Sequence, residues 1–227
     1  MTLQVLDSSG AKQNLSTTFD DTGQALVGST CIADPASGKK AGVSPFGELA
    51  VTTDTTTPTY RAAKLALTPV ASPTDVFVIQ GSATKTIRIK KIKLSGVATA
   101  QGNMPVQIVR RSSAGTPGSA VLTAITAVKH DTNDAAATAV ISSVGTANYT
   151  TLGTLVGVLG AKRLSMPASG SGAAGDGAET SFDFCRNADK ALVLRGTSDF
   201  ICVNFNGAAV PAGGVVDFEI EFEEDAS

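Results

Sequence analysis

The sequence predicts an all-β protein, a two-sheet antiparallel sandwich of jelly-roll type preceded by an extended N-terminal arm. Three observations lead to this prediction. Apolar runs of strand length follow one another from about residue 59 to the C-terminus, and turn residues separate them at regular spacing. No segment keeps a helical period of 3.6 residues beyond two turns. Charged residues make up only 17% of the chain, whereas Gly, Ala, Ser and Thr are abundant, as in many assembling β proteins.

The arm spans residues 1–58. Its short apolar stretches are separated by the turn sequences Asp-Ser-Ser-Gly, Asp-Asp-Thr-Gly and Asp-Pro-Ala-Ser-Gly. We expect short strands only around Leu3–Leu6 and Glu48–Val51. Because no piece of the arm can bury a core of its own, it needs a surface to lie on. That surface is its own domain, a sister subunit or a larger scaffold, so the arm is expected to anchor the protein or to exchange between subunits.

The sandwich domain is predicted over residues 59–227, and its strands are expected at successive apolar runs. Turn signals as regular as these favour a sandwich, a jelly roll or a barrel. Of these architectures we expect a two-sheet sandwich of jelly-roll type. One segment, DTNDAAATA, has the composition for a single helical turn. The expected strands lie in TDVFVIQG, TKTIRIKKIKLSG, MPVQIVRRS, AVLTAITAVKHD, ATAVISSVG, TLVGVLGAKRLSM, TSFDFCRN, ALVLRG, DFICVNFNG and GVVDFEIEFEE.

The last expected strand has the clearest alternation. Val216, Phe218, Ile220 and Phe222 alternate with acidic residues, which gives one apolar face and one acidic face. In DFICVNF, by contrast, both faces are apolar or neutral. That strand should therefore be central in its sheet and covered on both sides.

The segment Thr84–Gly96, TKTIRIKKIKLSG, carries five basic residues threaded through isoleucine and leucine. Its apolar positions alternate regularly except at Lys90 and Lys91, where the parity changes. One extra residue is what a β-bulge inserts, so we predict a bulge or a sharp bend at this point. With the bulge, the strand has one apolar face and one basic face.

Several interpretations of the basic face are open. It is either a solvated outer face, or it pairs with the acidic face of Asp217–Glu223, within one sheet or across a subunit boundary. Nucleic-acid binding is disfavoured, since the interleaved residues are aliphatic rather than aromatic and the formal net charge is -2. A membrane-surface role is disfavoured as well, because no Trp or Tyr belt accompanies the segment. The candidate assembly contacts are Lys90, Lys91, Lys93, Asp217, Glu219, Glu221 and Glu223.

The cysteines and the N-terminus indicate the compartment. The three cysteines, Cys31, Cys185 and Cys202, match no zinc spacing and no disulfide framework. Cys185 and Cys202 could be neighbours or even form a bridge, but buried free thiols in a reducing compartment are the simpler expectation. The N-terminal MTLQVLDSSG has neither a basic region nor an apolar run, so we expect no signal peptide.

The sequence predicts no catalytic, cofactor or metal site. The single histidine, His130, is expected in an exposed turn, and no nucleophile signature accompanies it. Asp131–Asp134 fits turn capping better than calcium binding, since the following AAATA supplies no ligands. Gly170–Gly177 lacks the Lys-Ser/Thr ending of a phosphate loop and is expected to be a surface loop. The pair Arg110 and Arg111 is expected to be solvated at a strand end.

The order of these motifs resembles a loose family of small virion proteins of tailed bacteriophages, encoded among head and tail genes. The pieces that carry the resemblance are VLDSSGAKQNLSTTFDDTGQALVGSTCIADPASG, SPFGELAV, TKTIRIKKIKLSGVAT, VQIVRRSSAGTPGS, DTNDAAATA, TLGTLVG, ALVLRGTSDFICVNFNG and the terminal FEIEFEE. The resemblance covers nearly the whole chain. It implies a jelly-roll-like sandwich, a virion location and self-assembly, and it carries no catalytic or ligand residues over to this sequence.

The expected function is therefore structural and non-enzymatic: an accessory virion protein that decorates or cements the capsid, or forms part of the collar or tail. Its expected partners are itself, as a homo-oligomer with a trimer as the expected state, and the capsid, portal, collar or tail proteins. We expect synthesis in the bacterial host cytoplasm, no nucleic acid, no membrane and no cofactor. The alternative from another class is a receptor- or carbohydrate-binding module of a tail fibre, and an enzyme such as a depolymerase is the least favoured.

Overall fold

The structure is a computed structural model of the whole chain, and it describes residues 3–6, 12–15, 57–118, 122–169, 179–185 and 190–226. The chain divides into two compact units, residues 1–54 and 55–227. In the first unit, strands β1 (Leu3–Leu6) and β2 (Lys12–Leu15) form an antiparallel pair. The strand expected at Leu3–Leu6 is confirmed, and the one expected at Glu48–Val51 lies outside the described residues. The role predicted for the arm stays a prediction.

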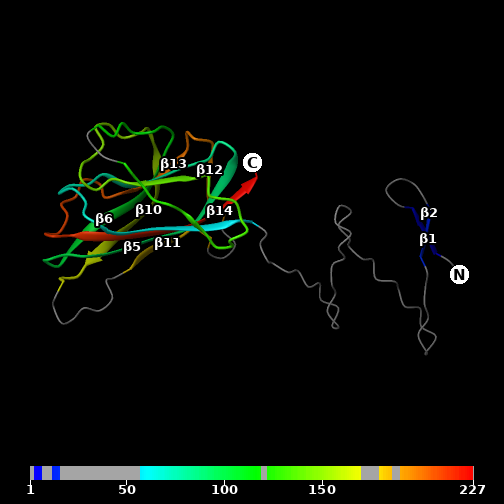
Figure 1. Cartoon of the computed structure of the whole chain (residues 1–227), viewed down its shortest axis with the longest axis horizontal. Coiled ribbons are helices and arrows are strands. Elements are labelled where there is room, and N and C mark those ends of the chain that lie inside the picture. Colours follow the sequence, from blue (N-terminus) through cyan, green and yellow to red (C-terminus); the bar gives the residue numbers. More distant parts are fainter. Residues whose placement is uncertain are drawn as a thin grey trace, which may run out of the picture. The chain divides into compact units, whose positions relative to one another are not determined.

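The second unit is a sandwich of two antiparallel sheets, which confirms the predicted all-β, two-sheet fold class, while the jelly-roll type stays a prediction (Figure 1). We call them sheet I, with the strand order β11-β5-β14-β3-β8 and with β12 also paired to β5, and sheet II, with the order β10-β6-β13-β4-β9-β7. The strands are β3 (Thr59–Leu67), β4 (Asp75–Gln80), β5 (Lys85–Val97), β6 (Gly102–Arg111), β7 (Thr123–Ala124), β8 (Val128–Lys129), β9 (Val140–Ser143), β10 (Leu155–Met166), β11 (Thr180–Asp183), β12 (Leu192–Arg195), β13 (Phe200–Asn204) and β14 (Val215–Ala226).

The chain passes repeatedly from one sheet to the other. Strands β3, β4, β5 and β6 alternate between sheet I and sheet II, so each of the first three connections crosses the sandwich. The last two strands then return into the middle of the sheets. In sheet II, β13 lies between β4 and β6, and in sheet I, β14 lies between β3 and β5. The strands β7, β8 and β9 extend both sheets on the side of β3 and β4.

The core lies between the two sheets and is built from the inward residues of each strand. At its centre the ring of Phe77 on β4 stacks on the ring of Phe218 on β14, with ring centroids 4.1 Å apart, so this aromatic pair joins the sheets. Within sheet I, Tyr60 stacks on Phe222 with centroids 5.4 Å apart. All four rings are buried. The alternation predicted for β14 therefore places Phe218 and Phe222 in the core.

The two finer predictions for individual strands are also confirmed. The register between β5 and β14 shifts between the pair Lys91–Glu221 and the pair Ile89–Phe222, so β5 has its extra residue at Lys90. All five residues of β13 are buried, and the strand has a neighbour on each side.

One strand was missed, and two local expectations were wrong. Strand β3 was not expected as a separate run, because its sequence, TYRAAKLAL, has weak alternation and its register shifts opposite Asp217. The run AVLTAITAVKHD was expected to give a full strand, but its described residues form only the two-residue strands β7 and β8. The segment DTNDAAATA forms no helical turn. It is held in an irregular path by Glu224, whose buried carboxylate accepts hydrogen bonds from the backbone N–H groups of Thr138 and Ala139, each 2.8 Å away.

Candidate functional site

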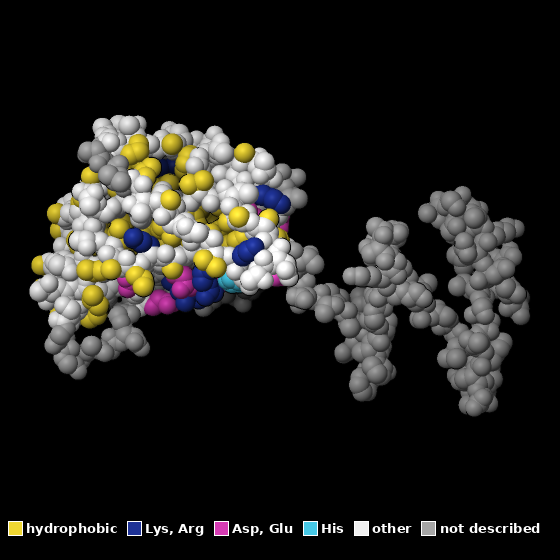
Figure 2. All heavy atoms as spheres, in the orientation of Figure 1, with side chains coloured by type: hydrophobic (Ala, Val, Ile, Leu, Met, Phe, Trp, Pro, Cys, Tyr) yellow, Lys and Arg dark blue, Asp and Glu magenta, His cyan; other side chains and the backbone are white. Residues whose placement is uncertain are grey.

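The basic and acidic strands predicted from the sequence lie side by side in sheet I. Strand β5 pairs antiparallel with β14, with Lys93 opposite Glu219 and Lys91 opposite Glu221. Of the interpretations left open by the sequence, the structure shows the pairing of the basic and acidic strands within one sheet. Figure 2 shows basic and acidic side chains next to one another along the lower rim of the domain. We call this charged face of β3, β5 and β14 the charged seam.

Most acids of the charged seam have a partner within the chain. Lys90 Nζ contacts Glu223, and Lys93 Nζ lies 3.9 Å from Glu219 Oε1 and 3.3 Å from Glu179 Oε2. Further partners are Arg61 for Glu219 and Glu221, Arg88 for Asp225, and the Ala66 N–H for Asp217.

These ion pairs fix the strand register more than they stabilise the fold. The side chains of Lys93 and Glu219 are 30% and 33% exposed, and pairs exposed to this degree contribute about 0–1 kcal/mol each. Lys91 has no ion pair among the described residues, although Glu221 lies opposite it. The role of these seven predicted residues as assembly contacts stays a prediction.

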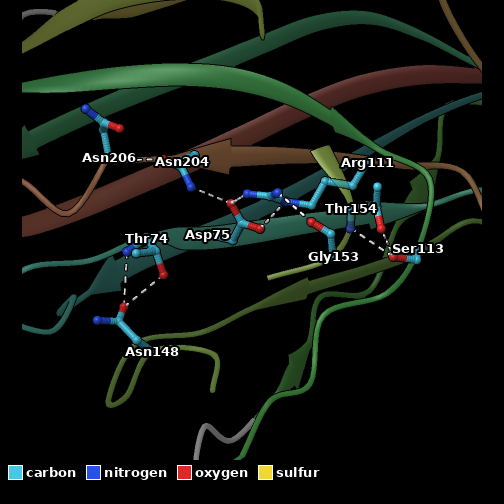
Figure 3. Close-up of polar contacts among 9 residues, drawn as sticks. All are labelled: Thr74, Asp75, Arg111, Ser113, Asn148, Gly153, Thr154, Asn204 and Asn206. Atoms are coloured by element: carbon cyan, nitrogen blue, oxygen red, sulfur yellow. Dashed lines mark hydrogen bonds and ion pairs between the residues drawn. The ribbon is translucent and has the colours of Figure 1, made fainter. Parts of the chain in front are cut away.

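A buried ion pair in sheet II was not predicted from the sequence (Figure 3). Arg111, at the end of β6, donates from Nε and Nη2 to the two carboxylate oxygens of Asp75, at 2.7 and 3.0 Å. The side chains are only 7% and 4% exposed. Asn204 on β13 donates to the same carboxylate at 2.5 Å. The expectation that Arg110 and Arg111 are both solvated was therefore wrong for Arg111. Arg110 is half-buried and pairs with Asp199.

The buried ion pair also holds the loop that precedes β10. Arg111 Nη1 donates to the carbonyl oxygen of Gly153 at 2.8 Å. Earlier in the same loop, the Asn148 side chain accepts a hydrogen bond from the Thr74 N–H at 3.0 Å and donates to the Ser72 carbonyl oxygen at 3.0 Å. The loop is thus tied to the sheet at two points (Figure 3).

Beneath this loop lies a pocket of about 260 Å³ on the outer face of sheet II. Its floor is apolar and comes from β4 and β13, and its walls come from β7, β9 and the loops around Gly115 and Tyr149. A Cβ atom on Gly115 would lie 2.8 Å from Tyr149 Cδ1, so the absence of a side chain there makes room for the tyrosine ring. The lining residues are Asp75, Val78, Gln80, Arg111, Ser113, Ala114, Gly115, Leu122, Ala124, Val140, Ser142, Tyr149, Phe200 and Cys202.

Two titratable groups of the pocket, the Tyr149 hydroxyl and the Cys202 thiol, are held in their neutral forms beside the Asp75–Arg111 ion pair. Burial raises the pKa of the Tyr149 hydroxyl to about 12, helped by the negative charge of Asp75. Burial also raises the pKa of the Cys202 thiol, and the neighbouring Asp75 carboxylate acts in the same direction. A thiol with a raised pKa is a weak nucleophile. The pocket is therefore suited to hold a small apolar group beside a neutral hydroxyl rather than to activate a nucleophile.

The structure also places His130, the turn at Asp131–Asp134 and two of the cysteines. His130 is exposed, and the Asn133 N–H donates to the Asp131 carboxylate at 2.9 Å, so the turn is capped as predicted. Cys185 and Cys202 are free thiols, half-buried and buried respectively. The segment Gly170–Gly177 lies outside the described residues. Among the residues that the structure describes, no group of three or more His, Cys, Asp or Glu side chains is placed to hold a metal ion.

Sequence reasoning missed Asp75, Arg111 and Tyr149. Asp75 precedes an apolar run and Arg111 ends one, so each resembles an ordinary strand-end residue. Their separation of 36 residues hides the pairing, and only the topology of sheet II brings them together. For Tyr149 the sequence did contain one indication of a special position, because it is one of only two tyrosines in the chain and lies in a Thr-rich loop.

In comparisons with known proteins, no family model, no curated protein and no solved structure matches this chain. In the described part of the chain, no helix is long and apolar enough to span a membrane.

Proposed function

We propose that the protein is a non-enzymatic structural component of a bacteriophage virion. It acts as an accessory protein that decorates or cements the capsid, or that forms part of the collar or tail. Its partners are further copies of itself, with a trimer as the proposed unit, and the capsid, portal, collar or tail proteins. The virion is its proposed location after synthesis in the host cytoplasm.

The observation that carries the proposal is the strand order of the sandwich. One sheet contains β3, β14, β5 and the two strands β11 and β12, which both pair with β5, and the other contains β4, β13, β6 and β10. Late strands inserted between early strands, with connections that cross between the sheets, are features of Greek-key sandwiches. This order supports the jelly-roll type that the resemblance to phage virion proteins implies, and jelly rolls are a common architecture of capsid proteins.

The surface chemistry supports the same proposal. The face of the domain in Figure 2 is largely hydrophobic or uncharged outside the charged seam. Among the described residues, ten large hydrophobic side chains are at least 40% exposed. Exposed apolar surface that gathers in one place usually marks contact with another chain.

The test is the position and copy number of the protein in purified particles, measured by quantitative mass spectrometry and cryo-electron microscopy. Many copies per particle are expected for a decoration protein, and a few copies for a collar or tail component. A variant that lacks residues 1–55 should stay folded by circular dichroism but lose its attachment to particles. Particles that contain none of the protein would contradict the proposal, and attachment of the shortened variant would contradict the role of the arm.

A further inference from the structure

Strand β10 lies at one end of sheet II and has an open edge. One side of it pairs with β6, and no other strand in the described part of the chain pairs with it. Its C-terminal half is covered by β11, because the Thr180 hydroxyl donates to the Arg163 carbonyl oxygen at 3.1 Å and Lys162 Nζ donates to the Ser181 carbonyl oxygen. Phe182 of β11 also lies beside Gly160, since a Cβ atom there would be 3.1 Å from Phe182 Cδ1. The open part is therefore the N-terminal stretch Leu155–Leu159.

This open stretch carries exposed apolar side chains. Leu155, Val156, Val158 and Leu159 are 54%, 62%, 51% and 40% exposed. The sequence contains no charged residue between Asp134 and Lys162. Natural sheets protect their edges with charges or with short strands. The other end strands follow this rule, since β7 and β8 have two residues each and β11 and β12 have four. The long apolar edge of β10 does not follow it.

The residues of this edge read the same in both directions. Leu155-Val156-Gly157-Val158-Leu159 is a palindrome centred on Gly157, and we call it the β10 edge segment. A two-fold axis brings a surface against an identical copy of itself, so a two-fold contact requires a self-complementary surface. An antiparallel pair of these segments about Gly157 would place each leucine opposite a leucine and each valine opposite a valine.

We propose that the β10 edge segment packs antiparallel against the same segment of a second copy of this chain, about a two-fold axis through Gly157. In this register Val156 of one copy lies opposite Val158 of the other. The nearest cationic residues along β10, Lys162 and Arg163, lie opposite Leu152 and Thr151 in this register, so like charges of the two strands do not face each other. A register shifted by one residue would place Gly157 opposite a valine and lose this match.

The bulges of β10 determine which groups form the two-fold contact. The register with β6 shifts between Leu155 and Gly157 and again between Val158 and Gly160, so Val156 and Leu159 are extra residues. Bulges on protected edges turn a strand away from new partners. Here the extra residues are valine and leucine, and both are exposed. The two-fold contact therefore rests on apolar side chains as well as on the open backbone.

This inference rests on the homo-oligomeric assembly of the proposed function, but not on the virion location. A two-fold contact joins two chains, or it joins two trimers into a hexamer where a trimer is formed elsewhere on the surface. In either case the substitution of Val156 by lysine is expected to halve the number of chains in the assembly, because it places an ammonium group against the apolar side chain of the second copy.

The first experiment measures the mass of the full-length protein by light scattering. The wild type is expected at an even multiple of the 22.9 kDa chain, and Val156→Lys at half the wild-type mass. The double variant Val156→Lys with Val158→Glu restores the original mass, because each lysine then faces a glutamate of the other copy. A monomeric wild type, or a Val156→Lys variant of unchanged mass, would overturn the proposal. So would a double variant that stays dissociated while circular dichroism shows it folded.

The second experiment places a cysteine on the axis. A Cβ atom on Gly157 meets nothing within 4 Å, so Gly157→Cys introduces no clash. Opposed residues of antiparallel strands have Cα atoms about 4.5–5.5 Å apart, which is within disulfide range. With Cys31 and Cys185 replaced by serine, mild oxidation should give a disulfide dimer at least ten-fold more abundant than in the control Leu65→Cys, a residue 72% exposed on β3. Equal yields would refute the two-fold contact, whereas absence of the protein from particles would refute only its virion role.

Discussion

Removing the carboxylate of Asp75 is expected to destabilise the fold strongly. In Asp75→Ala, the Arg111 guanidinium stays buried after losing two hydrogen bonds, and the Asn204 amide loses its acceptor. Breaking a buried ion pair by removing one partner costs about 3–5 kcal/mol. The lost amide bond adds about 1 kcal/mol. We therefore expect the free energy of unfolding to fall by about 4–6 kcal/mol.

The assay is equilibrium unfolding in urea, followed by circular dichroism, with thermal unfolding as a second readout. For a domain of the size of residues 55–227, each kcal/mol lowers the melting temperature by about 2–4 °C. The matched control is Arg110→Met, which removes the neighbouring and more exposed pair with Asp199 and should cost about 1 kcal/mol or less. The double variant Asp75→Ala with Arg111→Met leaves no buried charge, so it should recover about 2 kcal/mol or more relative to the sum of the single variants.

Two results would refute this reasoning. One is a cost for Asp75→Ala no larger than that for Arg110→Met. The other is strict additivity in the double variant, which would mean that the charges do not interact. The same variants test the link to the pocket, because Arg111 also holds the Gly153 carbonyl oxygen. Hydrogen exchange at the Gly153 loop should therefore become faster in Asp75→Ala and stay unchanged in Arg110→Met.

Two further predictions concern the charged seam and the pocket. Lys90→Met should lower the free energy of unfolding by up to about 1 kcal/mol, because Lys90 pairs with Glu223, whose side chain is only 12% exposed. The control Lys91→Met should have no measurable effect. Equal effects of the two substitutions in urea unfolding would contradict this prediction. The pKa of Tyr149 is raised to about 12 in the fold, above its ordinary value near 10, so folding favours the protonated hydroxyl. The resulting stabilisation is complete below pH 10 and is lost as the pH rises to about 12. Unfolding curves measured across this range should show the loss in the wild type and a smaller loss in Tyr149→Phe, and an identical pH dependence would contradict the assignment.

The sequence predicted the features that depend on neighbours along the chain. Alternation assigned the apolar face of β14 to the core, and the change of parity at Lys90 located the bulge of β5, because both patterns lie within one strand. The charged seam was anticipated for a similar reason, since five bases and four acids each followed a strand period. Strand β3 was missed because its own bulge, next to Ala66, interrupts the alternation on which the prediction depended.

The features that were missed depend on residues far apart in the sequence. Arg111 pairs with Asp75 across sheet II, and Glu224 caps the segment at Thr138 from a strand at the end of the chain. In the sequence alone, a solvated arginine at a strand end cannot be distinguished from a buried one, because burial depends on the sheet topology. The pocket could not be predicted either, because it exists only where two loops close over the outer face of β4 and β13.

The two outer faces of the sandwich differ in a way that bears on assembly. In sheet I the charged seam runs along β3, β5 and β14, and most of its acids are already paired within the chain. Such pairs are weakened by salt, and they leave little unmatched charge to attract a partner. In sheet II the outer face carries the apolar pocket and ends in the open β10 edge segment. Burial of apolar surface does not depend on charge and strengthens with area. The apolar contact proposed between copies of this chain is therefore made through sheet II, while the charged seam keeps the strands of sheet I in register and its role in assembly stays a separate prediction.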